Sequence, residues 1–334
     1  MRRLWVVIAL GLFAVAGGVS GQEVTPEVTV SIDVTPEVTP VIAARSPLVR
    51  FVVDGLNRSY VLHVPPEIDA PAPLVIMLHG RFGSGAGIET YTAFDRVADE
   101  EGFIIAYPDA FGGEWNYVEG VAGYPSEHDD IAFLHALIDH IAAAQPVDPA
   151  RIYLTGFSNG GFMVQRMACQ YPERFAGFAS VSAAAFGGMS QVCADRTAVP
   201  HAPMLMIHGT ADDNIPWDGT PISRDGQTIY ITYPVVDTFG YWASRNECGT
   251  DADTRDLEQL GSSPGTNVRV LSLHCPDDTA VVLYAIINGG HNWARPDQQF
   301  YPELGIINRD MDTAREIWDF FAPLSREQLV HSGF

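Results

Sequence analysis

Short apolar runs alternate with amphipathic segments along most of this chain. Runs of four to seven residues with few polar positions are typical of strands buried on both faces, and they occur at residues 74–78, 103–106, 152–155, 178–181, 204–207 and 281–287. Between two of these runs, apolar residues recur at helical spacing from 131 to 141. Asp129 and Asp130 precede that segment and are suitable caps, so the pattern predicts a helix that begins there.

Other segments complete the predicted fold. Residues 162–171 and 311–321 have the pattern of helices that bury one face. Residues 49–53 and 60–64 are β-rich and flank Asp54-Gly55, which predicts an antiparallel edge hairpin. Buried strands separated by helices predict an α/β fold, with a mainly parallel central sheet, helices on both faces and no large cap domain.

The N-terminus has the pattern of a secretory signal peptide. Two arginines precede an apolar run at residues 4–16, and small residues continue to Gly21. This pattern predicts that residues 1–21 are a signal peptide, removed by cleavage after Gly21. An uncleaved membrane anchor is the alternative, but the run is shorter than the ~20 residues that a spanning helix needs.

A linker and one folded domain are expected to follow. Residues 22–45 contain Val-Thr-Pro-Glu-Val-Thr twice and are rich in Pro, Thr and Glu, which is typical of an extended linker. Residues 46–334 then form a single domain, with no further boundary visible in the pattern. We expect a secreted, extracellular protein that does not associate with membranes after cleavage.

The composition excludes several classes of protein. Hydrophobic residues make up 47% of the chain and charged residues 18%, which suits a large core. All 19 basic residues are arginine, and the absence of lysine excludes Schiff-base catalysis, a P-loop and Ser-Lys catalysis. The formal net charge of −22 provides no basic surface for nucleic acid or an anionic membrane.

Four cysteines fit an exported protein, because oxidising compartments allow disulfides. Three pairings are open in principle. We favour the nearest-neighbour pairing, which joins Cys169 to Cys193 and Cys248 to Cys275.

The sequence predicts neither a metal nor an organic cofactor. Neither C-x-x-C nor H-E-x-x-H occurs, so a zinc site is not expected. Asp251, Asp253 and Asp256 resemble a calcium loop but lack its glycine and closing glutamate, and they predict a solvated acidic turn.

The strongest functional signal is the segment Gly-Phe-Ser-Asn-Gly-Gly at residues 156–161. It follows a predicted strand and opens a predicted helix, which is the context of a nucleophile elbow. The turn is so sharp that glycine is needed on both sides of the serine. The motif therefore predicts Ser158 as a nucleophile at the carboxyl edge of the sheet, and the alternative is a serine that only caps the helix.

A serine hydroxyl needs a base to remove its proton and an acid to orient that base. In this fold the order along the chain is serine, acid, histidine. Asp212 follows the fifth buried run, and His291 lies in a glycine loop directly after the sixth. Asp213 is the alternative acid, but we interpret it as a surface residue. We interpret His208, at the end of its strand, as structural.

A carbonyl attacked by serine develops negative charge on its oxygen, which needs two N–H donors already in place. One predicted donor is the backbone N–H of Asn159, the residue after the nucleophile. The other is the backbone N–H of Arg81, in the turn that follows the first buried run.

A series of short motifs also occurs in the order of a known family: Leu78-His79-Gly80, Tyr107-Pro108-Asp109, Trp115-Asn116, Asp129-Asp130-Ile131-Ala132-Phe133, the 156–161 segment, Gly209-Thr210-Ala211-Asp212 and Gly290-His291-Asn292-Trp293. On these motifs, residues 46–322 resemble the secreted polyhydroxybutyrate depolymerase and feruloyl esterase family of α/β-hydrolases. The resemblance implies that Ser158, Asp212 and His291 form a catalytic triad.

Some residues beside these motifs are expected to contact substrate. Asn292, Ala294 and Arg81 depart from the residues common in the family. Aromatic walls suit a planar aryl acyl group or a polymer chain. We therefore expect the loop tryptophans to line a substrate cleft, with ordinary packing as the alternative for each: Trp115, Trp217 and Trp293.

Together these features favour a secreted serine carboxylic-ester hydrolase that works through an acyl-enzyme. The expected partner is an ester substrate, either a feruloylated cell-wall polysaccharide or a polyester. A polyhydroxyalkanoate depolymerase, an acetylxylan esterase and an acyltransferase remain open alternatives. A silent binding module is disfavoured because all three triad residues are present, and a peptidase because no propeller or cap precedes the core.

Overall fold

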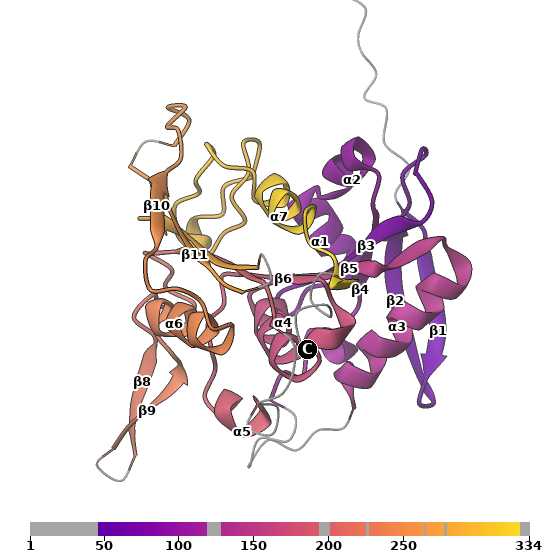
Figure 1. Ribbon diagram of the computed structural model, residues 1–334, viewed down its shortest axis with the longest axis horizontal. Coiled ribbons are helices and arrows are strands. Elements are labelled where there is room, and N and C mark those ends of the chain that lie inside the picture. The colour runs from indigo at the N-terminus through magenta and orange to yellow at the C-terminus, as the bar shows by residue number, and fades with distance from the viewer. Residues whose placement is uncertain are drawn as a thin grey trace, which may run out of the picture. The chain divides into compact units, whose positions relative to one another are not determined.

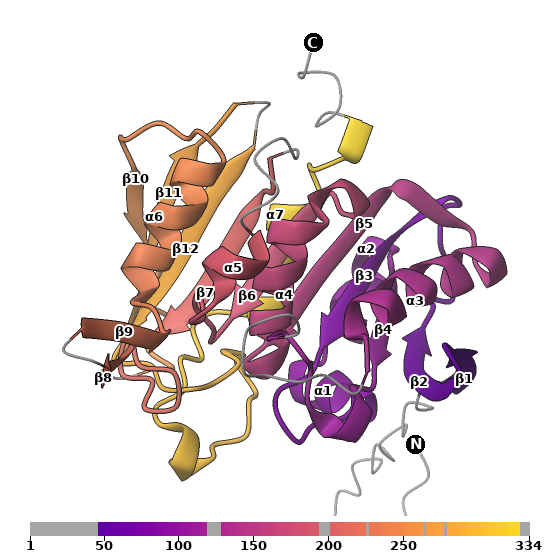
Figure 2. The same ribbon diagram turned by 90° about the horizontal axis from the view of Figure 1, so that it is seen from below.

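In the described part of the chain, a ten-stranded sheet lies at the centre and helices cover both of its faces (Figures 1 and 2). The structure is a computed structural model that describes residues 46–118, 128–193, 201–224, 227–263, 265–276 and 279–327. The expected signal peptide, residues 1–21, and the expected linker, residues 22–45, lie outside the described residues.

The strands follow the order β1-β2-β4-β3-β5-β6-β7-β12-β11-β10 across the large sheet, and β8 and β9 form a separate ribbon. The central strands from β4 to β12 pair in parallel, whereas the strands at both margins pair antiparallel. The bounds are β1 (Leu48–Val53), β2 (Leu56–His63), β3 (Ala72–Leu78), β4 (Ile104–Pro108), β5 (Val147–Phe157), β6 (Gly177–Val181), β7 (Met204–Gly209), β8 (Thr220–Arg224), β9 (Gln227–Thr232), β10 (Asp253–Asp256), β11 (Asn267–His274) and β12 (Ala280–Ile287).

Helices α3, α4, α5 and α6 pack on one face of the sheet, and α1, α2 and α7 pack on the other. Their bounds are α1 (Gly85–Thr92), α2 (Asp95–Glu101), α3 (Asp130–Ala144), α4 (Asn159–Gln170), α5 (Met189–Cys193), α6 (Val235–Arg245) and α7 (Thr313–Phe321), with short 3₁₀ turns η1 (Phe111–Gly113), η2 (Pro172–Arg174) and η3 (Pro302–Leu304). Among the described residues, no helix has both the length and the apolar character to cross a membrane.

Strand β3 shows why the central runs are continuously apolar. Successive side chains of a strand point to opposite faces. Leu74 and Ile76 therefore enter the core beneath α3 and α4, while Val75 and Met77 enter the core beneath α1 and α7. All four side chains are fully buried, so both faces of the strand must be apolar.

The main predicted elements are confirmed. The six apolar runs form β3, β4, β5, β6, β7 and β12, and the predicted hairpin forms β1 and β2. Its turn places Asp54 at φ 50° and Gly55 at φ 80°, as a tight hairpin requires. Asp129 caps α3 by accepting a hydrogen bond from the backbone N–H of Ala132 (2.8 Å), whereas Asp130 is already inside the helix and buried.

The margin of the sheet beyond β12 differs from the prediction. The expected acidic turn around Asp253 and Asp256 is instead the edge strand β10, paired antiparallel with β11. All residues of β10 are exposed, so the strand has no apolar pattern and depends on backbone pairing to β11. The structure also adds the β8–β9 ribbon, which projects away from the main sheet in Figure 1.

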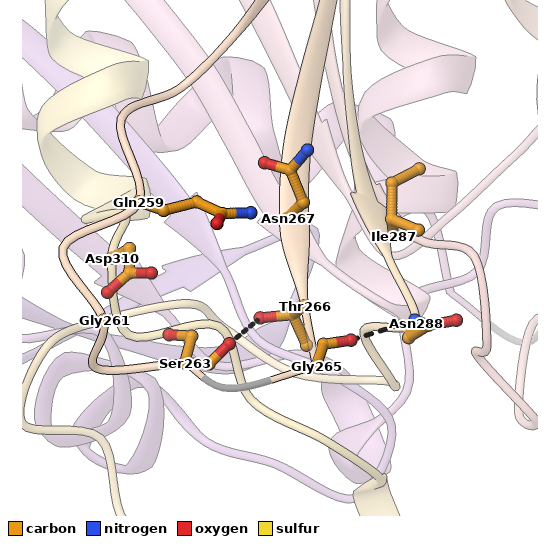
Figure 3. Close-up of a pocket in the computed structure, with 9 residues that line it drawn as sticks. All are labelled: Gln259, Gly261, Ser263, Gly265, Thr266, Asn267, Ile287, Asn288 and Asp310. Atoms are coloured by element: carbon orange, nitrogen blue, oxygen red, sulfur yellow. Dashed lines mark hydrogen bonds between the residues drawn. The ribbon is translucent and has the colours of Figure 1, made fainter.

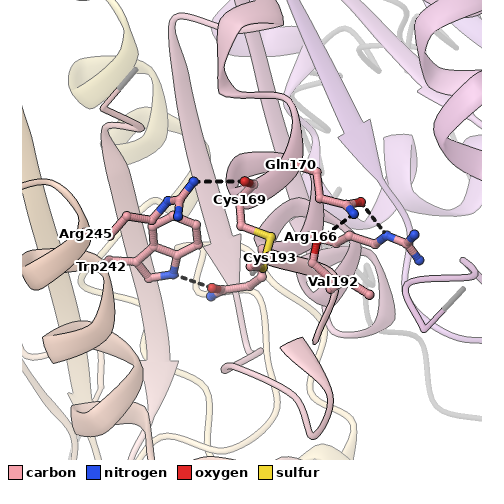
Figure 4. Close-up of a disulfide and its surroundings, with 8 residues drawn as sticks. Arg166, Cys169, Gln170, Val192, Cys193, Trp242 and Arg245 are labelled. Carbon is pink, nitrogen blue, oxygen red and sulfur yellow. Dashed lines mark hydrogen bonds between the residues drawn. A yellow bond between two sulfur atoms is a disulfide. The ribbon is translucent and has the colours of Figure 1, made fainter. Parts of the chain in front are cut away.

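Two disulfides link the helices to neighbouring segments. Cys169 in α4 is bonded to Cys193 in α5, and Cys248 after α6 is bonded to Cys275 after β11. This is the nearest-neighbour pairing. Around the first bridge, Arg245 donates to the carbonyl oxygen of Cys169 at 2.9 Å (Figure 4).

Candidate active site

Ser158 lies on a sharp turn between β5 and α4. Its backbone angles, φ 55° and ψ −116°, fall outside the regions that residues other than glycine normally occupy. A Cβ at Gly156 would lie 2.5 Å from the backbone of Gly160, and a Cβ at Gly160 would lie 2.6 Å from the carbonyl oxygen of Leu78. Glycine on both sides therefore makes this turn sterically feasible, and Ser158 remains partly exposed at the carboxyl edge of the sheet.

Asp212 and His291 meet at the ends of two neighbouring strands. Asp212 follows β7 and His291 follows β12, and because these strands pair in parallel their loops leave the same edge of the sheet. Nδ1 of His291 lies 2.7 Å from Oδ2 of Asp212, and both side chains are buried. The neighbouring Asp213 is exposed, in keeping with its interpretation as a surface residue.

Both oxygens of the Asp212 carboxylate have donors. Oδ1 accepts hydrogen bonds from the backbone N–H groups of Asn214 (2.9 Å) and Ile215 (2.8 Å). Oδ2 faces His291 and also lies 3.5 Å from Nε2 of His208. A carboxylate held in this way can fix the orientation of an imidazole.

His208 has more contact with the site than its position in the sequence indicated. Its Nε2 donates a hydrogen bond to the carbonyl oxygen of Ile215 (2.8 Å) in the same turn that holds Asp212. Burial lowers the pKa of His208, and the charge of Asp212 opposes this effect. The sequence places His208 four residues before Asp212, which was the available signal for a contact between them. Whether the two side chains meet depends on how the chain turns after β7.

The loops that carry the acid and the base pack directly on each other. A Cβ at Gly209 would lie 2.2 Å from the carbonyl oxygen of Gly289. The backbone N–H groups of Thr210 and Ala211 donate to the carbonyl oxygens of Ile286 and Gly289, each at 2.9 Å. Close backbone contact therefore sets the distance between the two side chains.

The base also lies beside the elbow. The imidazole ring of His291 is 4.9 Å from the ring of Phe157, the residue before Ser158. The loop after β12 thus crosses the ends of β7 and β6 to reach the end of β5. The structure brings Ser158, Asp212 and His291 together at one edge of the sheet.

The loop after β3 passes along the other side of the elbow. A Cβ at Gly80 would lie 3.5 Å from the Cβ of Ser158. The backbone N–H groups of Arg81 and Asn159 have no hydrogen-bond partner among the described residues. Two such donors next to a serine are what a developing oxyanion requires.

Two buried side chains, those of His79 and Asn159, connect the loops after β3 and β4 and the elbow. Nε2 of His79 accepts from the backbone N–H of Ala110 (3.0 Å), and Nδ1 donates to the carbonyl oxygen of Gly80 (2.7 Å). Burial lowers the pKa of His79, which favours this neutral tautomer. Oδ1 of Asn159 accepts from the backbone N–H of Trp115 (2.6 Å) and so joins the elbow to the loop after β4.

A buried ion pair between Arg58 and Asp130 supports the loop after β4. Nη2 of Arg58 lies 2.7 Å from Oδ1 of Asp130, and the guanidinium lies 3.6 Å from the centre of the Phe133 ring. Oδ2 of Asp130 accepts from the backbone N–H of Asn116 (2.8 Å), the residue after Trp115. Several motifs that carry the family resemblance are therefore joined in one hydrogen-bonded network.

The expectation that Trp115 and Trp293 line the cleft is wrong. Trp115 is 2% exposed, and its Nε1 donates to the carbonyl oxygen of His79 (3.0 Å). Trp293 is fully buried and packs near Phe94, with ring centres 6.4 Å apart. Both residues follow site motifs in the chain, but their side chains turn into the core. Trp217 is half-buried and remains partly accessible.

The described residues contain no group of three or more His, Cys, Asp or Glu side chains arranged to hold a metal ion. In the acidic segment near β10, Asp256 pairs with Arg269 (2.9 Å) and Asp253 with His274 (3.0 Å). These exposed side chains have partners across the edge of the sheet.

Comparisons with known proteins point to a family of esterases. The sequence profile of the family described as "Esterase PHB depolymerase" matches residues 58–215. The protein named "Putative esterase NocK" of Nocardia uniformis subsp. tsuyamanensis is 30% identical over 282 residues, 80% of each chain. Feruloyl esterase C of Emericella nidulans is 30% identical over 259 residues, which cover 75% of this chain and 82% of that protein.

A solved structure shows the same fold. The acetyl xylan esterase from Aspergillus awamori has a TM-score of 0.58 to this chain, with coverage of 83% of this chain and 99% of that one. The two sequences are 16% identical, so the likeness bears on the α/β-hydrolase fold alone. Two relatives are 30% identical to this chain over more than two thirds of its length, and the family model matches residues 58–215. The chain therefore belongs to the polyhydroxybutyrate depolymerase and feruloyl esterase family and is a carboxylic ester hydrolase.

Proposed function

We propose that Ser158, His291 and Asp212 act as the catalytic triad of this esterase, with the backbone N–H groups of Arg81 and Asn159 as the oxyanion hole. The 2.7 Å contact between Nδ1 of His291 and Oδ2 of Asp212 is the observation that carries the proposal. Because Nδ1 donates its proton to the carboxylate, Nε2 keeps the lone pair that a general base needs.

The reaction then runs in two halves. Oγ of Ser158 attacks the ester carbonyl carbon while Nε2 of His291 removes its proton, and the two backbone N–H groups stabilise the oxyanion. The carbon–oxygen bond to the alcohol breaks, the proton passes from His291 to that alcohol, and an acyl-enzyme remains. Water then attacks the acyl carbon and gives a proton to His291. The bond between that carbon and Oγ of Ser158 breaks, His291 returns the proton to Oγ, and the carboxylic acid leaves.

For the acyl group we propose a hydroxycinnamate such as ferulate. Tyr117 is half-buried, its ring stacks on Phe162 at 4.8 Å and it meets Phe186 edge-on at 5.0 Å. Phe162 lies one helical turn after Ser158, and its N–H donates to the Ser158 carbonyl oxygen. Phe162 and Phe186 are buried, so the partly accessible ring of Tyr117 is the surface of this group that suits a planar aryl acid. The relative named feruloyl esterase C supports this choice. Half-buried Trp217 is a further candidate for substrate contact.

A polyester is the second candidate substrate, because the β8–β9 ribbon has an exposed apolar face. Ile222 pairs with Ile229 across the ribbon, and Ile231 lies two residues further along the same face. Their exposed fractions are 41%, 38% and 54%. Such a face suits adsorption to an apolar polymer.

We further propose that the protein is exported. The pattern of residues 1–21 and the two disulfides support this proposal. Residues 22–45 would then link the mature N-terminus to a catalytic domain at residues 46–334.

Hydrolysis of p-nitrophenyl acetate, methyl ferulate and a polyhydroxybutyrate film by the purified protein tests these proposals. We expect methyl ferulate to give the highest kcat/KM, and product analysis with an added alcohol separates hydrolysis from acyl transfer. Ser158→Ala is expected to lower turnover by about 10⁴- to 10⁶-fold with an unchanged circular dichroism spectrum. Turnover within about tenfold of the wild type would mean that the nucleophile lies elsewhere.

A further inference from the structure

A cavity lies at the same edge of the sheet as the proposed triad, between β11, the end of β12 and the segment after η3 (Figure 3). Its volume is about 360 Å³, within the usual range for ligand pockets of about 300–1,000 Å³. We call it the amide pocket, after the side-chain amides of Gln259, Asn267 and Asn288. The other polar residues of its lining are Ser263, Thr266 and Asp310.

The lining selects against anions and offers no surface for aromatic stacking. Asp310 is the single charged residue among those that line the pocket, so an anion has no counter-ion there. No aromatic ring lines it, so an aryl group has no surface for stacking. Amide and hydroxyl groups both donate and accept hydrogen bonds, as do the hydroxyls of a sugar. The chemistry therefore matches an uncharged saccharide.

Several polar atoms of the pocket are available to a ligand. Gln259 is exposed, makes no hydrogen bond with the described residues, and extends toward the strand of Asn267 in Figure 3. Oδ1 of Asp310 accepts a hydrogen bond from the backbone N–H of Ser262 (2.9 Å). Its Oδ2 has no hydrogen-bond donor among the described residues. Asn288 uses its amide nitrogen on Gly265 (2.9 Å) and has its amide oxygen left.

The wall behind these atoms is already formed. Thr266 donates from Oγ1 to the carbonyl oxygen of Ser263 (3.2 Å) and accepts from Nδ2 of Asn308 (3.0 Å). All three residues are buried. A site whose wall is preformed loses less conformational entropy when it binds.

Asn288 connects this pocket to the acid and base loops. Its backbone N–H donates to Oγ1 of Thr210 (2.9 Å), two residues before Asp212. Three peptide steps separate Asn288 from His291, so their Cα atoms lie at most about 11 Å apart. Asn288 therefore joins the lining of the amide pocket to the loops that carry Asp212 and His291.

We propose that the amide pocket is a saccharide subsite, which binds an uncharged sugar residue of the polymer that bears the scissile ester. The choice of polymer rests on the proposed function, but binding of the sugar needs no catalysis. Gln259, Asn288 and Asp310 supply the contacts, and the subsite places the attached ester near Ser158.

Calorimetric titration of the full-length Ser158→Ala protein with an ester-free neutral arabinoxylan oligosaccharide tests the subsite directly. We expect Gln259→Ala to raise Kd about threefold to tenfold, the effect of one or two lost hydrogen bonds. This substitution removes no internal hydrogen bond of the described structure, so folding is preserved. Gln191→Ala, at an exposed glutamine on α5, is the matched control and should leave Kd unchanged. Absence of binding, or equal Kd values for all three proteins, would overturn the proposal.

Kinetics separate this proposal from the proposed function. In the active protein, Gln259→Ala should raise KM for a feruloylated oligosaccharide by about threefold or more, with methyl ferulate unchanged. Equal changes on both esters would reject the subsite. If neither ester is hydrolysed but oligosaccharide binding depends on Gln259, the subsite stands and the proposed function fails.

Discussion

The two sides of the catalytic edge are held in different ways. On the nucleophile side, after β3, β4 and β5, side chains hold the loops: His79, Asn159 and Asp130 each accept a hydrogen bond from the backbone of another loop. On the acid–base side, after β7 and β12, the backbones of Gly209 and Gly289 contact each other directly.

The difference follows from what each side has to position. The nucleophile side must aim backbone N–H groups at one point, and buried side chains can fix a loop from several ångströms away. The acid–base side must bring two side chains within hydrogen-bond distance from separate strands, which requires loops that approach closely. Substitution of one of these three side chains therefore removes a hydrogen bond on the first side, whereas substitution of Gly209 creates a steric clash on the second.

Among substitutions that test this comparison, the acid itself is expected to give the largest effect. Asp212→Asn is expected to lower kcat by about 10⁴-fold, because an amide no longer fixes the His291 tautomer. Asp213→Asn is the control, since that side chain is exposed, and its rate should stay near that of the wild type. Steady-state kinetics on p-nitrophenyl acetate compare the two variants. A larger loss for the Asp213 variant would reassign the acid.

A clash on the acid–base side comes next. Gly209→Ala would place a Cβ 2.2 Å from the carbonyl oxygen of Gly289 and push the two loops apart. A displacement of about 1 Å can cost about 100-fold in rate, so we expect a loss of that order in kcat.

Gly240→Ala provides the control for this clash. Gly240 lies within α6, and a Cβ there meets no atom within 4 Å. This variant should keep full activity and gain up to about 1 kcal/mol in stability from helix propensity. Equal activity of the two alanine variants would mean that close glycine packing does not set the acid–base geometry.

The nucleophile side should respond more mildly. Asn159→Ala leaves the N–H of buried Trp115 without its acceptor, which is expected to cost about 1–3 kcal/mol in the free energy of unfolding. We expect kcat to fall about tenfold while KM changes little, because the backbone donor remains but is less well positioned. Urea unfolding and steady-state kinetics measure both effects. An unchanged free energy of unfolding and an unchanged kcat for Asn159→Ala would contradict the explanation.

The smallest effect concerns pH. Asp95 accepts a hydrogen bond from Tyr107 of β4 (2.6 Å), and burial raises its pKa from 3.8 to about 6. The folded protein holds this proton more tightly than the unfolded chain, so ionisation lowers stability as pH rises from about 4 to about 6. Asp95→Asn keeps the acceptor and removes the charge. The difference in the free energy of unfolding between Asp95→Asn and the wild type should therefore grow by about 1–3 kcal/mol in favour of the variant from pH 4 to pH 7.

Urea unfolding at both pH values measures this difference. Asp237→Asn, at an exposed aspartate that is likewise in the first turn of a helix, is the control and should show a smaller change. A gain for Asp95→Asn that is the same at pH 4 and pH 7 would contradict the effect of ionisation.

The sequence by itself determined the central strands, the elbow and the residues proposed for the triad. Strands buried on both faces must be continuously apolar, and a turn as tight as that at Ser158 needs glycine at 156 and 160, so both leave local patterns. Asp212 and His291 could be named because the ends of parallel strands meet at one edge.

Only the tertiary structure decided which neighbouring side chains reach that edge. Trp115 and Trp293 turn into the core, while His208 contacts the acid. The pairing of β10 and the amide pocket also depend on contacts between segments far apart in the chain. Local patterns record backbone geometry and burial within one element, whereas the direction and partners of a loop side chain are set by the packing of other loops around it.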